Sequence, residues 1–140
     1  MYHFSPSRTP LLLYAARELK ANFMAFDLVL NDKARFTAKM TARSMGRLIG
    51  CPWNAFQTED QYTQELVDAG FDRDTVVMRD VTSDVFSGLV AHIERQQRSL
   101  RPYGITMGSF NVARRMFNWL DNTGVVRAVI VVARIKSKSA

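Results

Sequence analysis

The hydrophobic residues of this chain follow two kinds of spacing. Between positions 11 and 19, apolar residues recur at helical spacing, after a Ser-Arg-Thr-Pro segment of the kind that begins a helix. Residues 23–30, with the sequence FMAFDLVL, are instead apolar at both alternating sets of positions, except at Asp27. A strand without a polar face is covered on both sides, as in a layered α/β sheet. The pattern therefore predicts a helix followed by a buried strand.

The middle of the chain repeats this alternation. Residues 33–49 are expected to form a helix with Phe36, Met40 and Leu48 on one side. The other side of this helix is a basic stripe of Arg35, Lys39, Arg43 and Arg47. Thr58-Glu-Asp-Gln61 is a capping-box sequence, which begins a helix that ends at Gly70. Residues 71–81 alternate and predict a second strand.

The last third of the chain predicts two helices and a strand. Ser83 or Asp84 is expected to cap the first helix, which runs to Arg98. Its inward residues are expected to be Val85, Phe86, Leu89, His92 and Ile93. Residues 101–108 predict a loop, and a helix from Phe110 ends at 122–124. Residues 125–135 contain six consecutive apolar residues between two arginines, which places this strand inside the sheet.

Three strands separated by helices predict an α/β fold in a single domain, residues 1–140. The chain is 47% apolar and 23% charged, as in one globular domain, and folding at this length buries enough surface for a core. Three strands nevertheless make a small sheet for this apolar content, so part of the sheet is expected to be missing.

Charge and cysteine content add expectations about location and partners. The single cysteine, Cys51, forms no internal disulfide and suits a reducing compartment, so a cytoplasmic location is expected. No apolar run reaches the length of a membrane span, and the charged residues of the first 20 positions argue against a secretory signal. The net charge of +6 permits an anionic partner. We expect no nucleic acid partner, because stacking aromatic residues do not interleave with the basic stripe, which is read as a solvated helix face.

Several segments, taken in order, carry a family resemblance. They are residues 2–4 with His3, the helix ending at Lys20, the strand that contains Asp27, the helix ending Asp-Ala-Gly-Phe71, and the closing strand at 127–135. The set resembles the middle and end of a class I S-adenosylmethionine-dependent methyltransferase, in the small-molecule branch that includes sterol C-methyltransferases and sugar O-methyltransferases. The resemblance implies the C-terminal half of a Rossmann-like methyltransferase sheet, with family strands five, seven and six and flanking helices.

The chain also departs from that family. Its seven glycines never occur as Gly-x-Gly, so the family's glycine-rich cofactor half, with its acidic ribose-binding residue, is absent. The Pro-Gly-Gly turn before the strand at 23–30 is absent as well. S-adenosylmethionine is therefore the cofactor by resemblance only, and it is not expected to bind tightly to this chain alone. The strand at 23–30 should form a sheet edge with an uncovered apolar face, which would recruit a second copy or another chain.

Two residues are the candidates for catalysis. The resemblance places His3 where some sugar O-methyltransferases have the base that takes the acceptor's proton, although near a chain terminus it is also simply an exposed histidine. Asp27 is unusual in an apolar strand, because a buried carboxylate needs a partner. The resemblance places Asp27 at the cleft end of the strand, where it would orient His3 or the acceptor. The alternative is a carboxylate satisfied by a neighbouring helix N-terminus.

Six residues are the candidates for an acceptor pocket. Aromatic side chains with a polar edge suit a small apolar molecule, and the resemblance places these six in the segments that wall or cover the acceptor. They are Trp53, Phe56, Tyr62, Phe86, His92 and Tyr103. For each of them taken singly, ordinary packing between helices and sheet is the favoured interpretation, and His92 fits a core or interface histidine better than a ligand-binding one.

Other chemistry is less well supported. A nucleophilic role for Cys51 has no Cys/His arrangement around it, and one cysteine with two histidines composes no zinc pattern. The resemblance implies that the chain is a truncated methyltransferase-family protein, inactive alone, whose family moves a methyl group from S-adenosylmethionine to a small, largely apolar acceptor. The alternative is a methyltransferase-derived protein that binds a hydrophobic ligand or guides a cyclisation or isomerisation without methylating.

Overall fold

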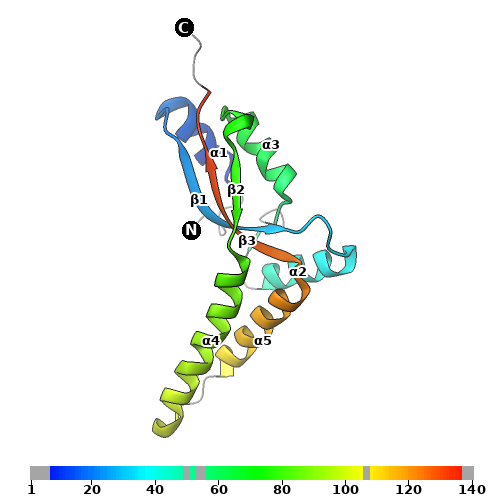
Figure 1. The fold of residues 1–140 in the computed structure, drawn as a ribbon, viewed down its shortest axis with the longest axis vertical. Coiled ribbons are helices and arrows are strands. Elements are labelled where there is room, and N and C mark those ends of the chain that lie inside the picture. The colour runs from blue at the N-terminus through cyan, green and yellow to red at the C-terminus, as the bar shows by residue number, and fades with distance from the viewer. Residues whose placement is uncertain (1–6, 49–50, 53–55, 106–107, 137–140) are drawn as a thin grey trace.

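The sheet of this protein has three strands in the part of the chain that the structure, a computed structural model, describes, which is residues 7–48, 51–52, 56–105 and 108–136. The strands are β1 (Phe23–Leu30), β2 (Val77–Asp80) and β3 (Val126–Ala133), in the order β1–β3–β2. β3 is antiparallel to both neighbours, so β1 and β2 run parallel to each other (Figure 1). The α/β fold class is confirmed, as is the position of the last strand inside the sheet.

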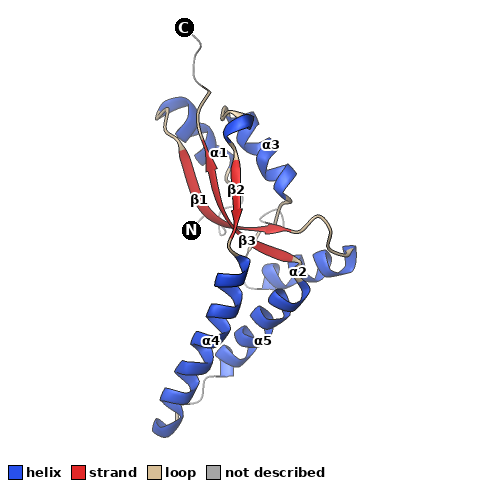
Figure 2. Ribbon diagram, in the orientation of Figure 1, coloured by secondary structure: helices blue, strands red, loops and turns tan. Residues whose placement is uncertain are grey.

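Helices precede or follow each strand (Figure 2). The α-helices are α1 (Thr9–Leu13), α2 (Phe36–Leu48), α3 (Glu59–Ala69), α4 (Thr82–Leu100) and α5 (Gly108–Thr123). Three short turns complete the elements: the π-helical η2 (Tyr14–Glu18) and the 3-10 turns η4 (Arg73–Thr75) and η5 (Arg101–Tyr103). Each helix that the sequence predicts is present, with boundaries that differ by a few residues.

Local chemistry fixes the ends of α3. The hydroxyl of Thr58 accepts a hydrogen bond from the Gln61 N–H, and the Gln61 side chain accepts one from the Thr58 N–H, so the predicted capping box is confirmed. Gly70 ends the helix with a φ of 118°, in the left-handed region that favours glycine. These two signals place α3 in register against the sheet.

Two predicted boundaries are wrong. β2 covers only Val77–Asp80 of the expected 71–81, because the Asp72 carboxylate accepts the Asp74 N–H and begins the 3-10 turn η4. The helix α4 begins at Thr82 and not after Ser83 or Asp84, because the Asp80 carboxylate accepts the Thr82 N–H at 2.9 Å. In both cases an aspartate forms a turn of its own at a point where the sequence pattern is weak.

One face of the sheet, here called the covered face, is closed by α1, η2 and α3. Val29 of β1 and Val129 and Val131 of β3 pack there against Leu12 of α1 and Leu66 of α3. All five side chains are buried. The covered face therefore holds a continuous apolar core.

The opposite face is covered over half of its length. Leu28 and Leu30 of β1 and Val126 of β3 pack against α2, α4 and α5 in a second core cluster. α4 and α5 then extend away from the sheet as a helical hairpin (Figure 1). This half of the face lies at the carboxyl end of β1, which pairs with the start of β3.

The other half of that face, here called the open face, is exposed. Met24 and Phe26 are 76% and 52% exposed, and their register partners Val132 and Ile130 are half-buried. Val77 of β2, also opposite Val132, is exposed as well. The expectation that residues 23–30 are covered on both sides is thus wrong for the first half of β1. The expectation of a sheet edge with an uncovered apolar face agrees with this arrangement.

The inward face of α2 also differs from the prediction. The residues expected to share a buried side include Phe36 and Leu48, which are exposed. The buried residues of α2 are instead Ala42 and Gly46. A small residue is required at Gly46 because the ring of Phe56 occupies the space where a Cβ atom would lie.

Candidate functional site

An apolar cavity lies between α2, α5 and the sheet, at the carboxyl end of β1. Its volume is about 140 Å³. None of its described lining residues is charged; they are Leu28, Ala42, Met45, Gly46, Phe56, Met116, Phe117, Leu120 and Val126. Apolar cavities of about 150 Å³ stay dry and bind molecules such as benzene. This cavity is therefore suited to a small apolar ligand.

Aromatic residues form and support the cavity wall. Phe56 reaches the lining because Gly46 leaves room for its ring. Phe117 of α5 lines the opposite wall and stacks on Phe86 of α4, with ring centroids 6.1 Å apart and an interplanar angle of 27°. Such pairs prefer offset geometry and hold each other's orientation. The aromatic part of the wall is therefore built from the loop residue Phe56 and from residues of α4 and α5.

A cluster of charged and polar residues lies on the covered face. Asp27 is fully buried, and Arg8 Nη1 donates to its Oδ2 at 2.6 Å. Arg8 also donates from Nη2 to Gln57 Oε1 at 2.8 Å and pairs through Nε with Glu65 Oε2 at 3.2 Å. The Arg8 guanidinium stands 4.1 Å from the ring centroid of Tyr62. One arginine at the start of α1 thus ties β1 and α3 together.

The sheet separates this charged cluster from the apolar cavity. Asp27 alternates with Leu28 along β1, so their side chains point to opposite faces. Leu28 lines the cavity, whereas Asp27 faces Arg8. Asp27 lies three residues before the end of β1, and Arg8, the residue that precedes α1, supplies its partner. A ligand in the cavity and the Asp27 carboxylate do not meet in this arrangement.

The candidate pocket residues fall in different places. Phe56 lines the cavity and Phe86 supports its wall, whereas Tyr62 is buried on the covered face. Tyr103 is 79% exposed. The inward position expected for His92 is wrong: the side chain is exposed, because α4 buries Phe86 and Ile93 and turns His92 to solvent. His3 and Trp53 lie outside the described residues.

Most of the residues that line the cavity carry no distinctive signal in the sequence. Met45 and Met116 were not separated from ordinary core residues, and Ala42 and Gly46 carry no chemical signal of their own. A pair of small residues four positions apart on α2 is the one pattern that indicates a close approach of another element. Phe56 was selected, but as part of a larger aromatic set.

Outside the cavity, one exposed ion-pair cluster joins three elements. Arg127 of β3 contacts Asp80 of β2, with Nη2 to Oδ2 at 2.7 Å, and also Glu59 of α3. Burial acts to raise the pKa of the Asp80 carboxyl, but hydrogen bonds from Thr82 and Arg127 outweigh it, and the pKa is lowered. The hydrogen bond to Asp80 in turn raises the pKa of Arg127. This cluster fixes the start of α4 relative to the sheet.

Cofactor and metal sites find little support in the described residues. Burial raises the pKa of the Cys51 thiol, which disfavours the nucleophilic thiolate. No group of three potential metal ligands occurs within residues 7–48, 51–52, 56–105 and 108–136. No two of the described glycines are adjacent or separated by a single residue, and the ring of Phe56 fills the space beside Gly46. The glycine-rich turn that the resemblance implies for S-adenosylmethionine is absent from the sequence, so cofactor binding stays a prediction.

Two comparisons of this chain with known proteins found no match. No protein-family model matches it, and no curated protein matches it. None of the helices in the described residues is both long enough and apolar enough to span a membrane.

Proposed function

We propose that this chain is the acceptor-side half of a small-molecule methyltransferase and that it holds a small, largely apolar acceptor in the cavity between α2 and α5. The observation that carries this proposal is the strand order β1–β3–β2, with β3 antiparallel between two parallel neighbours. The family resemblance implies this order for its strands five, seven and six. The cavity lies at the carboxyl end of β1, and in open α/β sheets ligands bind outside such ends.

In this proposal the chain positions the acceptor and excludes water. Met45, Phe56 and Met116 surround a molecule that enters the cavity, and an apolar wall removes competing water from it. The methyl donor belongs to a cofactor half that these residues do not supply, so no transfer step is assigned to them. The catalytic roles of His3 and Asp27 stay predictions, and the proposal gives Asp27 no part in holding the acceptor, because its carboxylate pairs with Arg8 on the opposite face of the sheet.

The missing half is proposed to dock along β1. The strand hydrogen-bonds to β3 on one side, while among the described residues its other side pairs only at Leu30, with Thr58. No lysine, proline or bulge protects this edge, and the open face with Met24 and Phe26 lies next to it. A polypeptide that adds a strand to β1 and a helix over the open face would bury both features. A second copy of the chain is the alternative occupant.

Ligand binding by the chain alone tests the acceptor cavity. Calorimetry with indole, a small apolar probe, should show saturable binding that the cavity-filling variant Ala42→Leu abolishes. Ala91→Leu, a half-buried alanine of α4 outside the cavity lining, should bind as the wild type does. Absence of indole binding, or equal binding by Ala42→Leu, would contradict the proposed cavity.

The methyltransferase assignment needs a separate titration. S-adenosylmethionine should not bind the chain alone at micromolar concentration, and it should bind a chimera in which the glycine-rich half of a small-molecule methyltransferase precedes residue 7. In that chimera the amides of β1 should exchange more slowly with solvent than in the chain alone, because a new strand covers the edge. Micromolar cofactor binding by the chain alone, or unchanged exchange along β1 in the chimera, would overturn this part of the proposal.

A second function fits the same cavity, because none of its described lining residues is charged. A methyltransferase-derived protein that binds a hydrophobic ligand without methylating needs no second half. Indole binding together with a chimera that fails to bind S-adenosylmethionine would favour this second function.

A further inference from the structure

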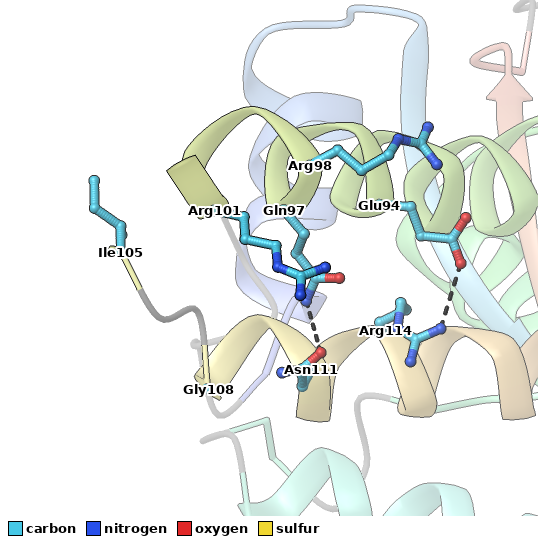
Figure 3. Close-up of a pocket in the computed structure, with 8 residues that line it drawn as sticks. All are labelled: Glu94, Gln97, Arg98, Arg101, Ile105, Gly108, Asn111 and Arg114. Carbon is cyan, nitrogen blue, oxygen red and sulfur yellow. Dashed lines mark hydrogen bonds and ion pairs between the residues drawn. The ribbon is translucent and has the colours of Figure 1, made fainter. Parts of the chain in front are cut away.

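A second concave site lies between α4 and α5, well away from the apolar cavity. It is a cleft of about 690 Å³ near the tip of the helical hairpin. The residues that line it are Glu94, Gln97, Arg98, Arg101, Ile105, Gly108, Asn111 and Arg114 (Figure 3). Unlike the cavity beside Phe56, it is rich in charged and amide groups. Its chemistry therefore differs from that of the proposed acceptor site.

The charges in this cleft are not balanced. Three arginines face one glutamate, a surplus of two positive charges. Glu94 is engaged by Arg114, with Nη1 to Oε1 at 3.3 Å. Arg98 and Arg101 have no carboxylate within 4 Å among the residues that the structure describes. Arg98 in the last turn of α4 and Arg101 at the start of η5 lie three positions apart, and their like charges repel each other unless an anion lies nearby.

One donor in the cleft is buried without an acceptor. The Nε of Arg114 is inaccessible to solvent and has no hydrogen-bond partner in the described part of the chain. The Arg114 side chain as a whole is 36% exposed, so an anion in the cleft would meet its guanidinium at the accessible nitrogen atoms and not at Nε. The guanidinium groups of Arg101 and Arg114 point into the gap between the helices, whereas the side chain of Arg98 extends along α4 (Figure 3).

The cleft is held at a fixed width by the two helices. Gln97 Nε2 of α4 donates to Asn111 Oδ1 of α5 at 2.6 Å, and the Arg114–Glu94 pair makes a second link one turn along. At Gly108, where α5 begins, no described atom outside its chain neighbours and its own helix backbone lies within 4 Å of the position that a Cβ would take. The site is thus a prepared cleft and not two independent flexible side chains.

We propose that this cleft binds the phosphate group of a small phosphorylated molecule. A phosphate dianion matches the surplus of two positive charges, and guanidinium groups bind its oxygens through paired hydrogen bonds. Arg95 and Arg115 lie on the same two helices, are exposed and do not line the cleft, so they provide a matched comparison. The proposal does not depend on the methyltransferase assignment.

Titration with pyrophosphate at low salt tests the site. The wild-type chain should bind it saturably, and Arg98→Ala with Arg101→Ala should weaken binding by about tenfold or more. Arg95→Ala with Arg115→Ala removes the same charge from outside the cleft and should leave the dissociation constant within about twofold. Circular dichroism verifies that both double variants stay folded, as expected for exposed arginines.

Three results would overturn the proposal. Equal weakening in both double variants would assign the binding to overall charge. Absence of saturable binding up to about 10 mM pyrophosphate would leave no site of useful affinity. Succinate binding as tightly as pyrophosphate would show that the cleft recognises carboxylates and not phosphate.

Discussion

The two faces of the sheet are built from the same strands and differ in what covers them. On the covered face, Val129 and Val131 are fully buried under α1 and α3. On the open face, the neighbouring residues Met24 and Phe26 are exposed, although they are as apolar as the buried ones. Apolar residues make both faces of a strand prone to burial, and the helices that pack against the sheet decide which of the two faces is buried.

The faces also differ in the groups that they carry. The covered face holds the only buried charged residue of the described chain, Asp27, and ties it to Arg8. The opposite side of the sheet holds the apolar cavity and, next to it, the open face with Met24 and Phe26. We therefore assign stability to the covered face and ligand or partner binding to the other.

The largest expected effect is the loss of Asp27. Asp27→Ala should lower the free energy of unfolding by about 3–5 kcal/mol, because Arg8 is left buried without its carboxylate. Urea denaturation measures this, with the exposed Asp121→Asn on α5 as control. Asp27→Ala combined with Arg8→Met should recover only part of the loss, because the largely buried Glu65 carboxylate, which also pairs with Arg8, then loses its cation. A loss below 1 kcal/mol in Asp27→Ala would show that the ion pair is not structural.

Truncation of one apolar residue on each face tests the comparison directly. Leu66→Ala on the covered side should lower the free energy of unfolding by about 2–5 kcal/mol, because it leaves a cavity in the core. Met24→Ala on the open face should change it by no more than about 0.5 kcal/mol, because the side chain already lies in solvent. Both values come from the same denaturation experiment. Equal losses would mean that the open face is covered in solution.

A charged residue on the open face should change association more than stability. Phe26→Lys should lower the apparent mass in a concentration series by size-exclusion chromatography, because lysine on an edge strand opposes pairing. Val112→Lys, at an exposed apolar residue of α5, is the control and should leave the apparent mass unchanged. A strictly monomeric wild type at high concentration would remove the basis for a second copy on the open face.

The smallest expected effect is a pH dependence carried by Asp80. Its pKa is lowered in the folded chain, so its contribution to stability is present above the pKa of an unfolded aspartate, about 3.9, and is lost as the pH falls through the folded value. Asp80→Asn should therefore flatten the decline of stability below about pH 4, whereas Asp121→Asn should not. An unchanged acid decline in Asp80→Asn would contradict the assigned cause.

Much of the fold was predictable, because its signals are local. The apolar run 23–30 and the capping box at Thr58 depend on neighbouring residues and are present as predicted. The length of β2 was not predictable from alternation, since Asp72 forms a turn inside the expected strand. Which face of β1 is left exposed depends on which helices pack against the sheet, and the residue pattern within the strand does not indicate this.

The candidate site was predictable only in part. Phe56 was selected, and the structure places it in the cavity, but His92 was expected inward and lies in solvent. Helical spacing alone does not show which of two adjacent faces of a helix is buried when that helix packs against another in a hairpin. The arginines of the α4–α5 cleft were also missed, because they are separated in sequence and meet only when the two helices pack.

The methionines offer the most direct test of the division between the faces. Met45 and Met116 line the cavity, Met24 lies on the open face and Met78 packs against the covered core. In a chain labelled with carbon-13 at its methionine methyl groups, titration with indole should shift the Met45 and Met116 signals saturably and leave those of Met24 and Met78 unmoved. Shifts at Met24 without shifts at Met45 and Met116 would place the ligand on the open face and contradict the account.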